Sequence, residues 1–252
     1  MIISVINQKG GVSKTTSVFN IAGNLAGEGY KVLQVDIDPQ ASLTIANGIE
    51  PSRIDKSIYD VLCEDVNIKE VLHEVGENLK ICVSKLDLSV AELSLVNKMA
   101  RETILKKVLK EVNKEFDFIL IDCPPNLGLL TINALCASDK VIIPASTDYL
   151  SLRGVDLLVK TVDKVKYNLN EDLDIIGIIA TMHNSRTTHS NEILEVFKNN
   201  YNVIGTISES VRVKDSILAG IPLCKFVPTH KTTKEYKKIS DKLIEIRKKE
   251  MQ

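Results

Sequence analysis

The stretch Asn7-Gln8-Lys9-Gly10-Gly11-Val12-Ser13-Lys14-Thr15-Thr16 lies near the start of the chain. It follows the apolar segment 1–6 and precedes a segment with helical character. A strand, a glycine turn and a helix in this order are typical of a phosphate-binding loop. Paired glycines let the backbone approach a polyanion, and the start of the helix favours negative charge. We therefore expect Lys14 to neutralise the β- and γ-phosphates of a nucleotide and Thr15 to ligate Mg²⁺.

This loop is a variant of the common pattern G-x-x-x-x-G-K-[ST], because Gln8 and Ser13 stand where that pattern has glycine. It reads K-G-G-x-x-K-T, with a second lysine, Lys9, at its head. The variant resembles the deviant phosphate loop (deviant Walker A motif) of the ParA/MinD family of P-loop ATPases. The resemblance implies that Lys9 reaches across a dimer interface to the partner's nucleotide. It implies an ATP site made by Lys9, Gly10, Gly11, Val12, Ser13, Lys14, Thr15 and Thr16. A glycine turn with two surface lysines is the alternative interpretation.

Two carboxylates follow the second apolar segment, in the run Val35-Asp36-Ile37-Asp38-Pro39-Gln40. We expect Asp36 to end a strand near the phosphate loop and Asp38 to lie beyond the strand end. The D-x-D-P-Q sequence looks like the first switch of ParA proteins, which implies that Asp38 positions or activates the attacking water. An ionised aspartate is a suitable acceptor for that water. A strand-end turn is the alternative, since Asp-Pro is common in turns.

A third signal is the run Phe118-Ile119-Leu120-Ile121-Asp122-Cys123-Pro124-Pro125. Four apolar residues followed by an acid are typical of a Walker B strand, whose Asp122 would hold the hydration shell of Mg²⁺. The D-x-P-P run resembles the family's second switch, where two prolines stiffen a loop that senses the γ-phosphate. Together these motifs assign catalysis to Lys9, Lys14 and Asp38, and Mg²⁺ binding to Thr15, Asp38 and Asp122.

Further segments in the same order resemble parts of ParA proteins. The run 144–154 looks like a segment that helps to form the dimer interface, although its residues alone indicate only a strand-to-helix loop. Arg186 and Arg212 match arginines that bind the DNA backbone, and a surface or salt-bridge role is the alternative for each. Asn184 and Pro228 lie where relatives frame the adenine base. Additional phosphate contacts without sequence preference could come from Lys225, Lys231, Lys234, Lys237 and Lys238.

Short β-rich apolar runs alternate with helical stretches along the chain. The predicted strands are 2–6, 31–35, 79–83, 116–121, 140–144, 175–181 and 203–207, and the predicted helices are 16–28, 91–113, 152–168, 190–199 and 231–249. This alternation predicts an α/β fold of the P-loop NTPase type: a mostly parallel, twisted sheet with helices on both faces and ligands at the carboxyl ends of its strands. Because no linker or repeat interrupts the pattern, we expect residues 1–252 to form a single domain.

The composition is that of a soluble globular protein, with 44% hydrophobic and 26% charged residues and a net charge of −1. Residues 211–252 carry 11 Lys and Arg against 5 Asp and Glu, which suits an anionic surface or a solvated helix. The five cysteines form no C-x-x-C pair, so we expect reduced thiols in the cytoplasm. The four scattered histidines are interpreted as structural. No apolar run approaches the ~20 residues of a membrane span, and we expect no targeting segment.

By this resemblance, the leading hypothesis is an ATP-dependent dimerising switch that binds DNA non-specifically and drives chromosome or plasmid partition. ATP with Mg²⁺ would join two subunits, and a ParB-like partner would stimulate hydrolysis, in a cytoplasmic, nucleoid-associated protein. The alternatives are a MinD-like ATPase that acts at a membrane or cell pole, and a P-loop transferase for a small molecule. The last predicted helix has an apolar stripe without Trp or Phe, so core packing rather than a membrane partner is favoured for Tyr236, Ile239, Leu243 and Ile246.

Overall fold

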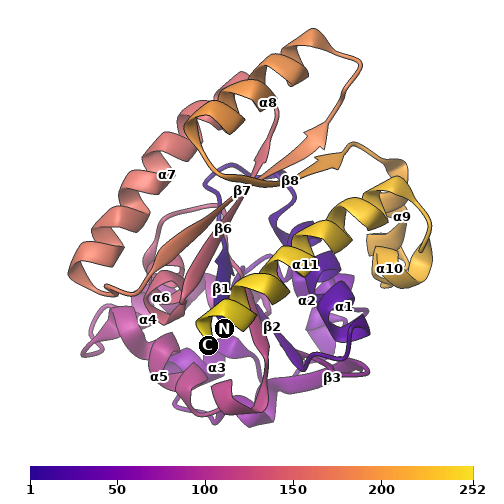
Figure 1. Ribbon diagram of the computed structural model, residues 1–252. Helices are drawn as coiled ribbons and strands as arrows, with labels where there is room; N and C mark the ends of the chain where they lie inside the picture. Colours follow the sequence, from indigo (N-terminus) through magenta and orange to yellow (C-terminus); the bar gives the residue numbers. More distant parts are fainter. Residues whose placement is uncertain (252) are drawn as a thin grey trace.

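The computed structural model describes residues 1–251 and has an eight-stranded sheet, in the order β3-β4-β2-β5-β1-β6-β7-β8 (Figure 1). Neighbouring strands are parallel, except that β3 and β4 form an antiparallel hairpin at one edge. The predicted α/β fold with a mostly parallel sheet is therefore confirmed. The strands are β1 (Ile2–Val5), β2 (Val32–Asp36), β3 (Leu72–Gly76), β4 (Leu79–Cys82), β5 (Phe118–Asp122), β6 (Lys140–Ser146), β7 (Asp174–His183) and β8 (Val203–Ser208).

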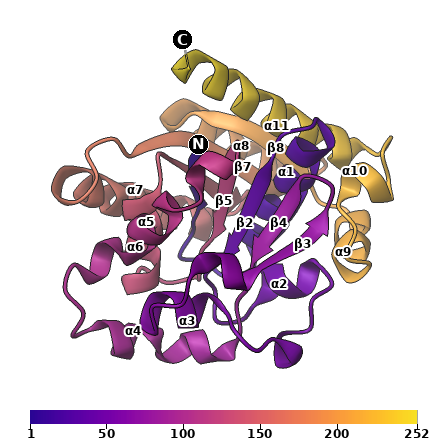
Figure 2. The same cartoon turned by 90° about the horizontal axis from the view of Figure 1, so that it is seen from below.

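Helices cover both faces of the sheet, and each layer shares its own buried apolar cluster with the strands. One layer consists of α1 (Lys14–Gly27), α2 (Ser42–Ala46), α9 (Val211–Leu218), α10 (Leu223–Phe226) and α11 (Lys231–Glu250). The other consists of α3 (Ile58–Cys63), α4 (Ala91–Leu95), α5 (Ile104–Lys110), α6 (Leu129–Ala137), α7 (Tyr149–Asn168) and α8 (Thr188–Asn200). Figure 2 shows strands between α11 and the group of α3 and α4. The central strands β2 and β5 are buried at every residue, as expected for parallel strands covered on both faces.

All seven predicted strands are present, but β3 and the shorter helices α2, α3, α6, α9 and α10 were not predicted. Strand β3 is half-exposed at the sheet edge, so it lacks the continuous apolar run of the buried strands. Helix α6 is apolar almost throughout, and a run of that kind has no helical periodicity to detect. Short 3₁₀ helices complete the connections: η1 (Pro51–Arg53), η2 (Ile68–Val71), η3 (Leu86–Val90), η4 (Arg101–Thr103) and η5 (Asn113–Glu115).

The predicted helix 91–113 is wrong, because the segment breaks into α4, η4 and α5. Ala100 adopts a left-handed backbone conformation with φ +52°, which ends any continuous helix. The Arg101 guanidinium donates to the carbonyl of Val96 at 2.7 Å. Asn133 on α6 accepts from the Leu105 amide and donates to the Arg101 carbonyl. In a continuous helix the Leu105 amide would donate to the Arg101 carbonyl, but here Asn133 of α6 binds both groups.

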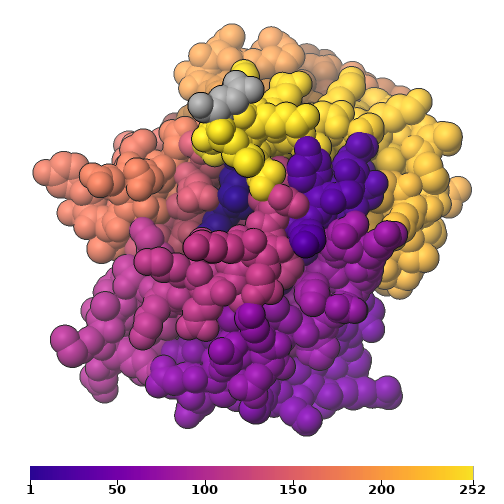
Figure 3. Space-filling view, turned by 60° about the horizontal axis from the view of Figure 1, so that its bottom comes forward, coloured from indigo at the N-terminus to yellow at the C-terminus, as the bar shows by residue number. Residues whose placement is uncertain are grey.

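The last helix, α11, closes the core beside the N-terminus of the chain. Figure 3 shows its yellow surface lying against indigo and purple segments. The side chains of Tyr236, Ile239 and Leu243 are fully buried, and Ile246 packs against the same cluster. Core packing of this apolar stripe is therefore confirmed. Across residues 1–251, no helix has the length and hydropathy needed to cross a membrane.

Candidate nucleotide-binding site

The turn between β1 and α1 adopts the backbone that a phosphate-binding loop needs. Gly11 has φ +73° and Ser13 has φ +68°, both in the left-handed region that favours glycine. Ser13 stands where the common pattern has glycine, so the serine occupies a conformation in which its Cβ costs about 1 kcal/mol. At Gly10 and Gly11 an added Cβ would meet no atom within 4 Å, so the surface beside the loop is open. The Val12 carbonyl accepts a hydrogen bond from Thr181 on β7, which ties the loop to the sheet.

Lys14 and Thr15 begin α1 and face two strand ends. The Thr15 hydroxyl donates to Asp122 Oδ2 at 2.6 Å, while Asp122 Oδ1 is buried without a hydrogen-bond partner among the residues that the structure describes. Burial raises the pKa of Asp122 well above its ordinary value, and the neighbouring Asp36 carboxylate raises it further. Burial also lowers the pKa of Lys14, although Asp122 opposes that change. The site therefore offers a ligand the Lys14 ammonium and the Asp122 carboxyl, one oxygen of which has no hydrogen-bond partner among the described residues.

Asp36 ends β2 beside Asp122, its neighbour in the register with β5, as expected. Its carboxylate accepts 2.8 Å hydrogen bonds from both the amide and the hydroxyl of Thr44, so it anchors α2. Burial raises the pKa of Asp36 to about 7, despite these hydrogen bonds, which lower it. Asp38 lies beyond the strand end, accepts from the Gln40 amide at 2.9 Å and lines the same cavity as Lys14.

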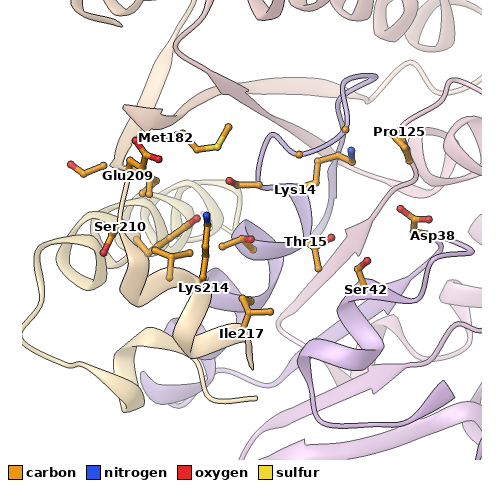
Figure 4. Close-up of a pocket in the computed structure, with 18 of the residues that line it drawn as sticks. Lys14, Thr15, Asp38, Ser42, Pro125, Met182, Glu209, Ser210, Lys214 and Ile217 are labelled. Carbon is orange, nitrogen blue, oxygen red and sulfur yellow. The ribbon is translucent and has the colours of Figure 1, made fainter. Parts of the chain in front are cut away.

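These side chains surround a cavity of about 480 Å³, which lies within the ~300–1,000 Å³ range of small-molecule sites. Lys14, Thr15 and Asp38 lie on one side of it, with Ser42 and Pro125 nearby (Figure 4). The residues fit ATP and Mg²⁺, since the loop supplies an anion site and the unpaired Asp122 oxygen suits a hydrated cation. The opposite wall was not predicted from the sequence. It is formed by β7, β8, the loop between β8 and α9, α9 and α11, through Met182, Ile207, Glu209, Ser210, Val213, Lys214, Ile217 and Tyr236.

Unlike Lys14, Lys9 does not line the cavity. Its ammonium lies 2.7 Å from Asp148 Oδ2 and 3.2 Å from the Ser151 hydroxyl, at the start of α7. Burial would raise the pKa of Asp148, but hydrogen bonds from Lys9, Ser146 and the Ser151 amide outweigh it and lower the pKa to about 2. The structure thus holds Lys9 against the segment 144–154. Asp148 lies within the run 144–154, whose resemblance to a dimer-interface segment was the sequence feature that pointed to it, and an acidic residue just before a helix is also a capping signal.

The remaining predicted residues lie at the same end of the sheet. Asn184 and Arg186 follow β7 and line a second cavity of about 520 Å³, which shares Ser208, Glu209, Ser210 and Lys214 with the first. Pro228 lies in the turn between α10 and α11, where the His230 amide donates to the Val227 carbonyl. Arg212, on α9, is exposed and lies 3.5 Å from Asp215. Because β7 and β8 are parallel neighbours, the structure brings the segments carrying Arg186 and Arg212 to one edge of the sheet.

Comparisons with known proteins agree with this architecture. A family model described as an AAA domain matches residues 1–175. The sporulation initiation inhibitor protein Soj of Bacillus subtilis is 40% identical over 239 residues, which cover 93% of this chain and 94% of that protein. The chromosome partitioning protein ParA of Myxococcus xanthus is 43% identical over 195 residues, covering 77% of this chain and 69% of that protein.

Among solved structures, one named as a cobyrinic acid a,c-diamide synthase from Mycobacterium smegmatis, with bound ADP and magnesium, has a TM-score of 0.83. It is 34% identical, and the match covers 96% of this chain and 93% of that one. The loop, the strand order and these relatives define the chain as a P-loop ATPase. More narrowly, it belongs to the ParA/Soj family of partition ATPases.

Proposed function

We propose that the cavity between α1 and α9 binds ATP with Mg²⁺ and hydrolyses it. The observation that carries the proposal is the convergence of Lys14, Thr15 and Asp38 on this one cavity, with the buried Asp122 carboxyl behind them, where it accepts a hydrogen bond from Thr15. In this proposal the loop residues 10–16 hold the phosphates of the nucleotide in their own copy, Lys9 contacts the nucleotide of a second copy, and Thr15, Asp38 and Asp122 would bind Mg²⁺. When bound, the metal neutralises charge on the phosphates. Asp38 orients the attacking water, because its carboxylate lies in the cavity beyond the end of β2.

ATP joins two copies of the chain in this proposal. The geometry of Lys9 supports it, since the ammonium is bound at the protein surface by Asp148 and Ser151 rather than placed beside Lys14. Lys9 of each copy then contacts the nucleotide of the other. Tyr149 and Leu150, next to Asp148, are large apolar side chains that are 55% and 70% exposed, so a second copy would remove apolar surface from water there.

The joined protein binds DNA through phosphate contacts without sequence preference. Arg186 and Arg212 carry this part of the proposal, because both follow the carboxyl ends of adjacent strands near the nucleotide cavity. Lys237 contributes less than other C-terminal lysines, since its ammonium is already paired with Glu28 and Asp241. A ParB-like partner stimulates hydrolysis, and release of DNA follows. The protein would then act as one unit, residues 1–252, associated with the nucleoid.

The test is binding to a random-sequence DNA duplex with no nucleotide, with ADP and with ATP. We expect binding with ATP alone, weakening steeply as salt rises. Arg186→Ala and Arg212→Ala should each reduce both the affinity and its salt dependence, whereas Arg53→Ala, at an exposed position on η1, should change neither. Equal binding in all three nucleotide states would contradict the switch.

A second candidate is a small-molecule enzyme, which the name of the Mycobacterium smegmatis relative favours. Such an enzyme would need an acceptor substrate beside the γ-phosphate. Substrate-independent ATP turnover, raised by DNA and a ParB-like protein, would count against this candidate. Turnover that requires an added carboxylate acceptor would favour it.

A further inference from the structure

The cavity wall opposite the phosphate loop contains a lysine, Lys214, in addition to Lys14 on the loop side. It lies on α9, and its side chain rises from that helix into the cavity (Figure 4). Lys14 enters the same cavity from the loop on the other side. An anion bound between two ammonium groups on opposite walls of one cavity is attracted by both of them. Lys214 therefore marks a second place at which the cavity can hold negative charge.

The position of α9 indicates which part of a nucleotide Lys214 meets. The loop and Lys14 bind the β- and γ-phosphates in the proposed function, so the rest of the nucleotide extends toward the opposite wall. That wall combines the apolar side chains of Met182, Ile207, Val213, Ile217 and Tyr236 with the polar residues Ser208, Glu209, Ser210 and Lys214. Apolar side chains with a small number of polar groups among them are typical of a small-molecule site and suit a base and sugar. From that wall, Lys214 would meet the nucleotide between its terminal phosphates and its base, at the α-phosphate.

The two basic residues of α9 face different directions. Arg212 and Lys214 are two positions apart, which turns them about 200° from each other around a helix. Arg212 is exposed and reaches Asp215 on its own helix at 3.5 Å, and it does not line the loop cavity. Lys214 lines both this cavity and the neighbouring one that contains Asn184 and Arg186. Of the two basic side chains on α9, Arg212 therefore lies on the protein surface and Lys214 lies at the cavity.

We propose that Lys214 is a nucleotide-binding residue that contacts the α-phosphate of ATP and ADP from the wall opposite the phosphate loop. This inference rests on the proposed nucleotide site and adds a specificity-determining residue to it. Because ATP and ADP share the α-phosphate, the contact strengthens both complexes alike and favours neither state of the switch. It discriminates instead between phosphorylated nucleosides and uncharged ones.

The test compares the affinities of fluorescently labelled ATP and ADP for four full-length proteins at low salt: the parent, Lys214→Met, Lys214→Arg and the control Lys107→Met. Methionine keeps the aliphatic stem but removes the charge. We expect Lys214→Met to weaken both nucleotides about tenfold, as for loss of one charge-assisted hydrogen bond at a partly exposed site. Lys214→Arg should restore most of the affinity, and Lys107→Met, on an exposed part of α5, should leave it unchanged.

The outcomes separate this inference from the proposed function. Failure of the parent protein to bind either nucleotide would remove the proposed site itself. Normal binding by the parent, with Lys214→Met within twofold of it for both nucleotides, would overturn only the role of Lys214. A loss confined to ATP would also overturn the α-phosphate contact, because it would place Lys214 at the γ-phosphate. Thermal unfolding without nucleotide should be the same for parent and Lys214→Met, which excludes a merely structural effect.

Discussion

The ammonium of Lys9 lies 2.7 Å from Oδ2 of Asp148, 139 positions further along the chain. Asp148 also caps α7, since its other carboxylate oxygen accepts from the Ser151 amide at 3.0 Å. The Lys9 and Asp148 side chains are 38% and 37% exposed, so solvent weakens the pair to the ~0–1 kcal/mol of surface ion pairs. In the proposed dimer Lys9 must leave this partner before it can reach the other nucleotide.

Asp148→Asn should make ATP-dependent dimerisation easier. The amide keeps the oxygen that caps α7 but loses the charge that holds Lys9. We expect dimers at an approximately two- to fivefold lower protein concentration, with unchanged nucleotide affinity of the monomer, measured by analytical ultracentrifugation with a non-hydrolysable ATP analogue. Asp163→Asn, at an exposed position of the same helix, is the control. Weaker dimerisation of Asp148→Asn would mean that Asp148 works within the dimer instead.

Lys14→Ala and Lys9→Ala should separate binding from assembly. Loss of Lys14 removes the buried cation of the cavity, so nucleotide affinity should fall by about 100-fold or more. Loss of Lys9 should leave the nucleotide affinity of the monomer within about twofold but abolish the ATP-dependent dimer. Equilibrium titration and ultracentrifugation measure the two effects. Unchanged ATP affinity in Lys14→Ala would refute the phosphate-loop assignment.

Asp38→Ala should stop hydrolysis without stopping binding. The carboxylate lies in the cavity and is proposed to orient water, a role typically worth about 10²- to 10⁴-fold in rate. We expect ATP binding and dimers on DNA to persist while turnover falls by such a factor, followed as phosphate release. Retained turnover at the parent rate would show that Asp38 is only the strand-end turn residue that accepts from Gln40.

The ligand-free protein should lose stability as pH rises toward neutrality. Burial raises the pKa of Asp36 from its ordinary 3.8 to about 7, so the folded state binds a proton that the unfolded state has released. The contribution of Asp36 is therefore fully present below about pH 4 and is lost as pH rises through about 7. Asp36→Asn should flatten this part of the profile of thermal unfolding against pH. A parent profile that rises between pH 5 and 7 as steeply as that of Asp36→Asn would contradict the assignment.

Ser13→Gly should relax the loop. Glycine adopts φ +68° without the cost of a Cβ, although it also increases the entropy of the unfolded chain. These effects nearly cancel, so we expect a change in unfolding free energy within about 1 kcal/mol. Ser13→Val, which is β-branched, should destabilise by more than 1 kcal/mol. Urea unfolding measures both, and equal stabilities of the two variants would show that the left-handed conformation is not maintained in solution.

The sequence by itself determined the fold and the place of the loop that forms the phosphate end of the proposed site. Buried parallel strands are continuous apolar runs, and the loop of residues 7–16 lies between the first strand and the first helix, so both are encoded locally. Asp38 and Asp122 could be predicted for the same reason, because Asp122 ends β5 and Asp38 lies two residues beyond the end of β2. Strand ends of a parallel sheet meet at one edge, and this alone brings residues far apart in the chain to one place.

Only the tertiary structure decided the opposite wall and the resting partner of Lys9. The Lys9–Asp148 pair and the place of Lys214 in the cavity depend on how β6, β8 and α9 pack beside the loop. The break near Ala100 likewise depends on Asn133 of α6, 32 residues beyond the Arg101 carbonyl that it binds. Contacts of this kind are set by distance in space, and neither periodicity nor local propensity carries information about them.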